Sequence, residues 1–146
     1  MALKSTVYKA DLQITDLHRH YYANHQLTLA LHPSETPERM MVRLMAFADS
    51  ASELLQFSQG LDNPDDPALW EKDLTGAIVH WIDLGQPDES RVRKATGRAD
   101  KVSVYCYGGS STTLWWSQLV NKLGRLQNLR VVRLSEESVN ALAGLC

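Results

Sequence analysis

Residues 77–87 read AIVHWIDLGQP, and they set the pattern for the fold. The run over residues 77–84 is apolar on both of its faces, which is typical of a strand that lies in the middle of a sheet and is covered on both sides. Gly85 lets the chain turn after this strand, and Pro87 is suited to the first turn of a helix. A central strand that leads at once into a helix predicts an α/β protein.

The chain after this segment repeats the same strand-to-helix pattern. Alternating apolar residues predict further strands, and caps and glycines mark the ends of the helices between them. The predicted strands cover residues 101–107 and 129–134, and the predicted helices cover residues 87–96 with Gly97 as the end, residues from Ser111 or Thr112 to Gly124, and residues from Ser135 onward.

The residues before this segment predict antiparallel strands. Strands over residues 3–14 and 27–31 can pair as an N-terminal hairpin through the polar stretch 15–24. A helix over residues 37–51 follows, with Thr36 as its cap and Pro37 in its first turn. The remaining predicted elements are a strand over residues 53–57, a loop over residues 60–73 with a brief strand at residues 68–70, and a turn at Thr75-Gly76. The prediction is therefore one α/β domain over residues 1–146, with a mixed sheet preceded by a β-hairpin.

The composition excludes several classes of protein. Hydrophobic residues make up 44% of the 146 residues, which is too high for a disordered chain. An apolar run of about 18 residues, which a membrane-spanning helix requires, does not occur. The first nine residues lack the apolar core of a secretory signal. With Cys106 and Cys146 as the only cysteines, we expect a reduced cytoplasmic location and no disulfide framework.

The charge is divided unevenly along the chain. Residues 1–90 carry 6 basic and 14 acidic side chains, whereas residues 91–133 carry 9 basic side chains and Asp100 as their one acid. This division indicates either an anionic partner near the basic part or one half of the fold that neutralises the other.

Asp83 is the candidate functional residue of the central strand. A carboxylate at the end of a buried strand has to be solvated, hydrogen-bonded or placed beside a cation. Strand ends beside helix N-termini are common ligand sites in α/β sheets. The alternative is a carboxylate that only caps the following helix.

A second carboxylate can reach Asp83 in one of two ways. If Thr75-Gly76 turns the chain, residue 83 pairs near residue 68, and Asp66 or Asp65 comes within reach. If instead the strand over residues 53–57 pairs directly with the central strand, Glu53 lies near Asp83. Both pairings place Asp73 away from the site.

Carboxylates that converge at a strand end are suited to Mg²⁺ or Mn²⁺. Such an ion can activate water and stabilise a phosphodiester under attack, with a nearby cation holding the developing charge. Arg91 and Lys94, on the following helix, are candidates for that cation. Together with Arg98 they form one face, which is suited either to a phosphate backbone or to solvent alone.

The other polar and reactive residues indicate structural roles. His80 points away from Asp83 on the same strand and is expected to be a buried, hydrogen-bonded imidazole. Cys106 lies in a predicted strand with no base nearby, so we expect it to be a core residue. Helical spacing favours core packing for at least one ring of the Trp115-Trp116 pair, although such rings can also stack on bases.

Short stretches spread in order over nearly the whole chain resemble one known family. They are residues 1–4 (MALK), 32–36 (HPSET), 38–41 (ERMM), 55–57 (LQF), 60–61 (GL), 81–85 (WIDLG), 87–88 (PD), 94–95 (KA) and 115–116 (WW). Together they look like the bacterial YaeQ family. The resemblance implies a compact fold built around a variation of the PD-(D/E)XK nuclease motif, with an αβββαβ core, and more chain with additional strand beyond Cys146.

The resemblance also implies roles for single residues. Asp83 matches the acidic residue of the (D/E)XK element, but Gly85 stands in the lysine position. Lys94 is then the lysine that replaces it from the following helix. Asp66 or Asp65 matches the acid of the first element, and Glu38 matches an extra acid on the first helix.

Three functions follow as expectations. The first is hydrolysis of nucleic acid with Mg²⁺ or Mn²⁺, with Asp66 and Asp83 as metal ligands and Lys94 as the charge stabiliser; Glu38, Glu53 and Arg91 are auxiliary. The alternative is a non-catalytic module on a degenerate nuclease fold that binds nucleic acid or a protein, for which the family resemblance suggests a partner in transcription. A third option is an enzyme that acts on a small anionic substrate.

Overall fold

The computed structural model describes residues 5–58, 61 and 63–146. Leu3 and Gly60, which belong to a predicted strand and a predicted loop, lie outside the described residues. From residue 37 onward the order of helices and strands is the predicted one. In chain order the elements are β1 (Thr6–Asp16), β2 (Tyr21–Leu31), α1 (Pro37–Ser50), β3 (Leu55–Phe57), β4 (Leu69–Lys72), β5 (Ile78–Leu84), α2 (Glu89–Arg98), β6 (Ala99–Cys106), α3 (Ser110–Leu123), β7 (Leu129–Arg133) and α4 (Glu136–Ala143).

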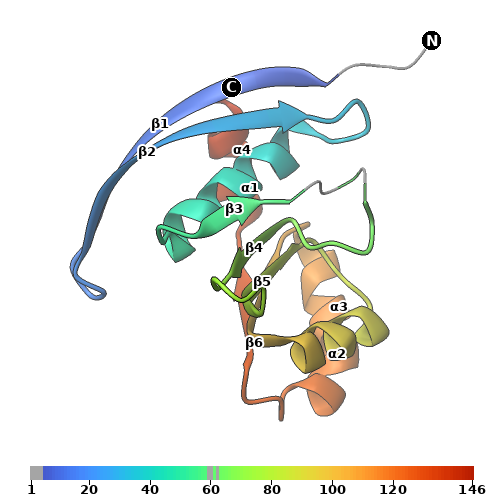
Figure 1. The fold of residues 1–146 in the computed structure, drawn as a ribbon. Coiled ribbons are helices and arrows are strands. Elements are labelled where there is room, and N and C mark those ends of the chain that lie inside the picture. The colour runs from blue at the N-terminus through green and yellow to red at the C-terminus, as the bar shows by residue number, and fades with distance from the viewer. Residues whose placement is uncertain (1–4, 59–60, 62) are drawn as a thin grey trace.

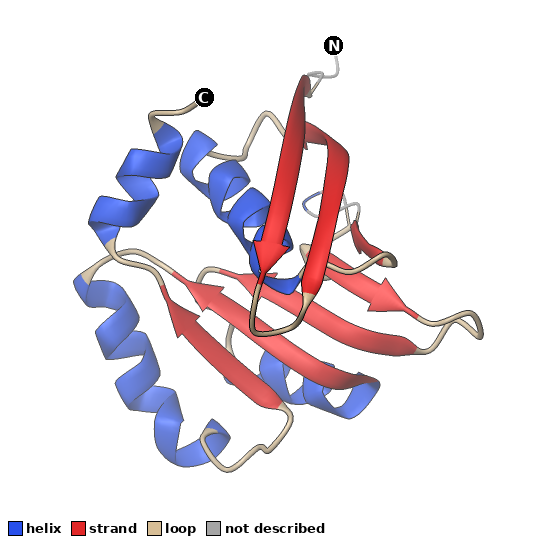
Figure 2. Cartoon of the chain, turned by 90° about the vertical axis from the view of Figure 1, so that its left-hand side faces the viewer, coloured by secondary structure: helices blue, strands red, loops and turns tan. Residues whose placement is uncertain are grey.

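A five-stranded mixed sheet forms the centre of the molecule, with the strands in the order β3-β4-β5-β6-β7 (Figure 2). The strands β3, β4 and β5 are antiparallel, and β5, β6 and β7 are parallel. The parallel strands are connected through α2 and α3, as crossover units require. The predicted mixed sheet, with an antiparallel part followed by crossover units, is therefore confirmed.

The two faces of this sheet are covered by different elements (Figure 1). On one face, Ile82 packs in a core cluster with Phe47 of α1. On the other face, Trp81 packs with Ala95 of α2 and Trp115 of α3. Because adjacent residues of β5 enter opposite cores, this strand carries apolar residues on both of its faces, as the sequence predicts.

The turn at Thr75-Gly76 sets the register of β4 against β5. The Asp73 carboxylate accepts hydrogen bonds from the backbone of Thr75 and Ala77, and Gly76 takes the positive φ of 88° that this turn needs. The resulting register pairs Leu69 with Ile82. Of the two pairings that the sequence left open, the structure has the one that brings residue 83 near residue 68.

The N-terminal hairpin is longer and its turn is tighter than predicted (Figures 1 and 2). Each strand has 11 residues, and residues 17–20 alone form the turn, so the long loop predicted over residues 15–24 is wrong. The Asp16 carboxylate accepts hydrogen bonds from the backbone amides of His18 and Arg19, and His20 takes a φ of 54°. This side-chain cap makes a tight turn without glycine.

Three element boundaries differ from the sequence prediction because of local caps. Strand β3 begins at Leu55 rather than Glu53, since the Ser52 hydroxyl accepts a hydrogen bond from the Leu55 amide. Helix α2 begins after Asp88 and continues through Gly97, which does not end it. Helix α3 begins at Ser110 without a side-chain cap, because the hydroxyls of Ser111 and Thr112 donate to backbone carbonyls instead.

Several polar groups in the core are paired with neighbouring groups. The His80 ring is buried and its Nε2 lies 2.8 Å from the Ser103 hydroxyl, which confirms the predicted structural imidazole. Cys106 and Trp115 are buried as predicted, and the Trp115 indole donates to the Pro87 carbonyl at 2.8 Å. Within the described residues, no helix is long and apolar enough to cross a membrane.

Acid is expected to destabilise the fold through His80. Burial, and then the positive charges of Lys101 and Arg130, lower the pKa of His80 to about 4, whereas the unfolded imidazole titrates near 6.5. Between these two values the unfolded chain binds the extra proton, so the free energy of unfolding falls as the pH drops, by at most about 1.4 kcal/mol for each pH unit. Urea unfolding of the protein and of His80→Gln at pH 7, 6, 5 and 4.5 measures the difference in slope.

The matched control is His18→Gln, which removes an exposed imidazole from the hairpin turn. It is expected to keep the pH dependence of the original protein. A His80→Gln variant that loses stability with acid as steeply as the original protein would contradict the role of this buried ring.

Candidate functional site

Asp83 lies near the end of β5, and its side chain is only 6% exposed. Gly85 turns the chain directly after the strand, with a φ of 87° and a hydrogen bond from its amide to the Tyr105 carbonyl. Asp88 then caps α2 by accepting a hydrogen bond from the Arg91 amide at 2.8 Å. This short connection returns the first turn of α2 to the strand end, as the sequence predicts for a ligand site of an α/β sheet.

The Arg91 guanidinium holds both oxygens of the Asp83 carboxylate. Its Nε donates to Oδ2 at 2.9 Å and its Nη2 donates to Oδ1 at 3.0 Å. The same guanidinium donates to the backbone carbonyls of Pro64, at 2.5 Å, and Asp66, at 2.8 Å. One cation therefore joins the loop before β4, the end of β5 and the first turn of α2.

Electrostatics favour the charged form of Arg91. The hydrogen bonds to Asp83 raise the pKa of Arg91, the negative charges of Asp83, Asp65 and Asp88 raise it further, and partial burial opposes them. The Asp83 carboxylate is thus paired within the protein rather than left open to solvent.

A cleft of about 330 Å³ lies beside this pair. Asp66, Asp83 and Arg91 line it together with Arg39 from α1. Arg39 is itself paired with Glu35, its Nη1 lying 2.5 Å from Oε2. The other residues that line the cleft are Leu61, Pro64, Pro67, Ala68, Leu84, Gln86 and Pro87.

Glu38 lies in the first turn of α1 and does not line this cleft. Its charge acts on Tyr107 instead. Burial raises the pKa of the Tyr107 phenol, Arg39 opposes this shift, and Glu35 and Glu38 add to it. Glu38 is therefore close to the cleft without being a partner of Asp83.

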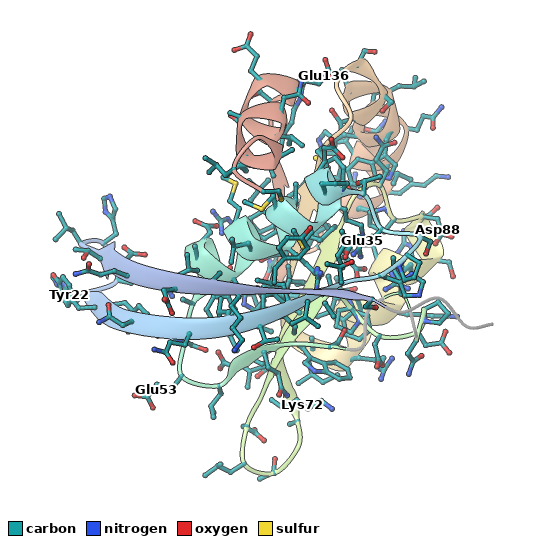
Figure 3. The ribbon with its side chains drawn as sticks, turned by 90° about the horizontal axis from the view of Figure 1, so that it is seen from above. Tyr22, Glu35, Glu53, Lys72, Asp88 and Glu136 are labelled. Atoms are coloured by element: carbon teal, nitrogen blue, oxygen red, sulfur yellow. The ribbon has the colours of Figure 1, made fainter. Side chains whose placement is uncertain are left out.

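Glu53 lies level with the start of β5, whereas Asp83 lies near the end of that strand. The predicted pairing that would bring Glu53 to Asp83 is therefore wrong. Strand β4 lies between β3 and β5, and the register places Leu55 beside Glu71 and Glu71 beside His80, at the start of β5. Figure 3 shows Glu53 and Asp88 on opposite sides of the molecule. The strand over residues 53–57 does not pair directly with the central strand, because β4 forms within the predicted loop and lies between them.

A groove of about 460 Å³ runs along the exposed side of α2. It is lined by the predicted face of Arg91, Lys94 and Arg98, and by Trp81 of β5. The Arg98 guanidinium lies 5.3 Å from the centre of the Trp81 ring, and that of Arg91 lies 5.9 Å from it, on the distance scale of cation–π contacts. The remaining residues that line the groove are Asp65, Asp88, Ser90 and Ala95.

The Trp81 indole N–H is a buried donor that lacks an acceptor among the described residues. The residue is only 2% exposed, and buried donors are nearly always paired.

The donor set around Asp83 does not fit a divalent ion. Both carboxylate oxygens accept hydrogen bonds from Arg91. Within residues 5–58, 61 and 63–146, no group of three or more His, Cys, Asp or Glu side chains is placed to hold a metal. Asp66 and Asp83 share the cleft, but the cation between their segments is a guanidinium.

The sequence predicts Lys94 as the charge stabiliser and Arg91 as an auxiliary cation, and the structure places Arg91 beside Asp83. Arg91 follows the Asp88 cap by three residues and therefore lies in the first turn of α2, while Lys94 lies almost one turn further from the strand end. An aspartate cap at Asp88 was the sequence signal that could have favoured Arg91 over Lys94. No sequence pattern indicated that Arg91 would also bind the backbone carbonyls of Pro64 and Asp66.

The chain was then compared with known proteins. A family model described as "YaeQ: YaeQ protein" matches residues 1–146. The chain is 43% identical over 139 residues to "Uncharacterized protein YaeQ" of Escherichia coli (strain K12), which covers 95% of this chain and 77% of that protein. It is 42% identical over 143 residues to the protein of the same name in Salmonella typhi. That match covers 98% of this chain and 79% of that protein.

Solved structures give the same result. The crystal structure of YaeQ protein from Xanthomonas axonopodis pv. citri is similar with a TM-score of 0.95 and 55% identity, over 97% of this chain and 80% of that one. The crystal structure of YaeQ protein from Pseudomonas syringae is similar with a TM-score of 0.90 and 40% identity. This match covers 95% of this chain and 76% of that one.

The pairing of Asp83 with Arg91 is expected to stabilise the fold. Asp83→Asn leaves the guanidinium without its counter-charge and is expected to lower the free energy of unfolding by about 2–3 kcal/mol. The loss stays below that of a fully buried pair because the Arg91 side chain is 33% exposed. Urea unfolding of Asp83→Asn, Arg91→Gln and the double variant gives the coupling, which we expect to be about 1–2 kcal/mol.

The control is Arg93→Gln, which removes an exposed ion pair with Glu89 from the same helix. It is expected to change the free energy of unfolding by less than about 1 kcal/mol. Effects of Asp83→Asn and Arg91→Gln that simply add would contradict the pairing.

Proposed function

The chain belongs to the YaeQ family, and we propose that it is a non-catalytic module that binds nucleic acid through the groove along α2. The order α1-β3-β4-β5-α2-β6 is the αβββαβ order that the nuclease resemblance implies, and it supports a nuclease-like origin of the fold. In this proposal the fold keeps a surface for the phosphate backbone and has replaced the reactive centre.

The observation that carries the proposal is the set of cations along the groove. Lys94 and Arg98 are exposed, and among the described residues neither has a carboxylate within ion-pair distance. By contrast, Arg93 and Lys122 are both paired with Glu89. Arg98 contacts the Trp81 ring, but its charge and that of Lys94 are not neutralised by a carboxylate, so both can neutralise phosphates.

A phosphate backbone also suits the remaining groups of the groove. The Trp81 indole N–H is an orphaned donor, and phosphate oxygens are strong acceptors. Asp65 and Asp88 line one part of the groove, and Asp88 is engaged in capping α2. The basic segment 91–133 supplies the cations that line the groove, which are Arg91, Lys94 and Arg98.

The arrangement around Asp83 supports binding rather than cleavage. Arg91 neutralises Asp83, and Gly85 stands where the nuclease motif has its lysine. Metal-dependent hydrolysis with Mg²⁺ or Mn²⁺ is the second candidate, because Asp66 and Asp83 line one cleft. It would require Arg91 to leave both oxygens of Asp83.

Removal of the free cations is expected to weaken the binding of nucleic acid. Replacing Lys94 and Arg98 together by alanine removes two phosphate contacts, so the affinity for a fluorescently labelled oligonucleotide should fall about tenfold or more at low salt. The slope of log affinity against log salt concentration should also become shallower by about 1–2. Fluorescence anisotropy across a salt series measures both quantities.

Arg93→Ala is the matched control, since it removes a positive charge of α2 that is paired with Glu89. It should change the affinity less than twofold or so. Absence of any salt-dependent binding by the original protein would refute the proposed function. Cleavage of the oligonucleotide with Mg²⁺ or Mn²⁺ that Asp83→Asn abolishes, in a folded variant, would favour the second candidate instead.

A further inference from the structure

We propose that Gln56 and Trp70, which form one row with the buried Trp81 across the sheet, receive unpaired bases, so that the ligand of this surface is single-stranded nucleic acid. The inference rests on the proposed function and adds the class of nucleic acid to it. In this arrangement the groove along α2 holds the backbone, and the sheet next to it holds the bases.

The row follows from the strand register. Gln56 of β3 lies directly opposite Trp70 of β4, and Trp70 lies directly opposite Trp81 of β5. Residues that are paired in this way lie on the same face of a sheet. The Trp70 and Trp81 rings meet edge to face, with centroids 6.3 Å apart. The row therefore leads from the edge strand β3 to the Trp81 side of the groove.

This part of the sheet face is open to a ligand. The helices α2 and α3 bury Trp81 through Ala95 and Trp115, on the parallel side of the sheet. Further toward the edge, Trp70 is only half-buried and Gln56 is exposed. An aromatic ring and an amide side by side are suited to stack on a base and to hydrogen-bond its edge.

Cations accompany both rings. The Lys72 ammonium lies 3.8 Å from the centre of the Trp70 ring, and the Arg98 guanidinium lies 5.3 Å from the centre of the Trp81 ring. Among residues 5–58, 61 and 63–146, Lys72 has no carboxylate within ion-pair distance. Each ring thus has a positive group beside it, and the one beside the half-buried Trp70 ring is suited to the phosphate next to a base that stacks there.

The tryptophan ring distinguishes a single-stranded ligand from a double-stranded one. Cations on their own neutralise the phosphates of both. In a duplex, however, the faces of the bases are stacked on one another and are not available to a protein ring. An acidic peptide would use the cations and leave the ring faces without a role. The positive charges and the half-buried ring of Trp70 therefore favour an unpaired strand.

The experiment compares a labelled single strand of about 12 nucleotides with its duplex by fluorescence anisotropy, a length within the site sizes of single-strand-binding folds. Trp70→Leu should weaken binding of the single strand about tenfold and leave binding of the duplex unchanged. Trp70→Phe, which keeps a ring, should restore most of the affinity. The matched control is Tyr22→Leu, because Tyr22 is 59% exposed and lies at the turn of the hairpin, far from Lys72 (Figure 3).

Photo-crosslinking tests the original protein, so that a folding defect of Trp70→Leu leaves the inference testable. A single strand that carries 5-iodouracil should crosslink to the peptide that contains Trp70. Crosslinks that avoid this peptide, or equal affinities of Trp70→Leu and the original protein for the single strand, would overturn the inference and leave the proposed function standing. Binding of neither nucleic acid would refute the proposed function itself, and tighter binding of a polyglutamate peptide would refute both.

Discussion

The pairing of Arg91 with Asp83 is the interaction on which the local architecture depends. Four oxygen atoms from two segments converge on the guanidinium of a third: the two carboxylate oxygens of Asp83 and the carbonyl oxygens of Pro64 and Asp66. The contact therefore closes the loop before β4 onto the strand end and fixes the start of α2, which in turn presents its outer face to solvent.

The same contact divides the surface into two chemically different regions. Within the cleft, the charges of Asp83 and Arg39 are both matched by partners in the protein. Along α2, Lys94 and Arg98 remain without a carboxylate among the described residues. In the proposed function, an anion is therefore attracted to the helix and the neighbouring sheet face rather than to the strand end. This separation favours a surface that binds over a centre that cleaves.

Most of the architecture could be predicted from the sequence, because it depends on local patterns. The run before Asp83, the turn at Gly76 and the cap at Thr36 each act over a few residues, and the structure has all three. The hairpin turn was missed because Asp16 replaces the usual glycine signal. The site was harder to predict, since its main contact joins Arg91 to backbone carbonyls 25 and 27 residues away, and backbone acceptors leave no trace in a sequence.

A crystal structure of the protein grown with MnCl₂, with anomalous scattering collected at the manganese edge, tests most directly whether Arg91 is the resident cation of this oxygen cluster. We expect the guanidinium to keep its hydrogen bonds to Asp83 and the anomalous map to show no manganese beside that carboxylate. A manganese ion bound between Asp66 and Asp83, with Arg91 turned away from both, would contradict the account.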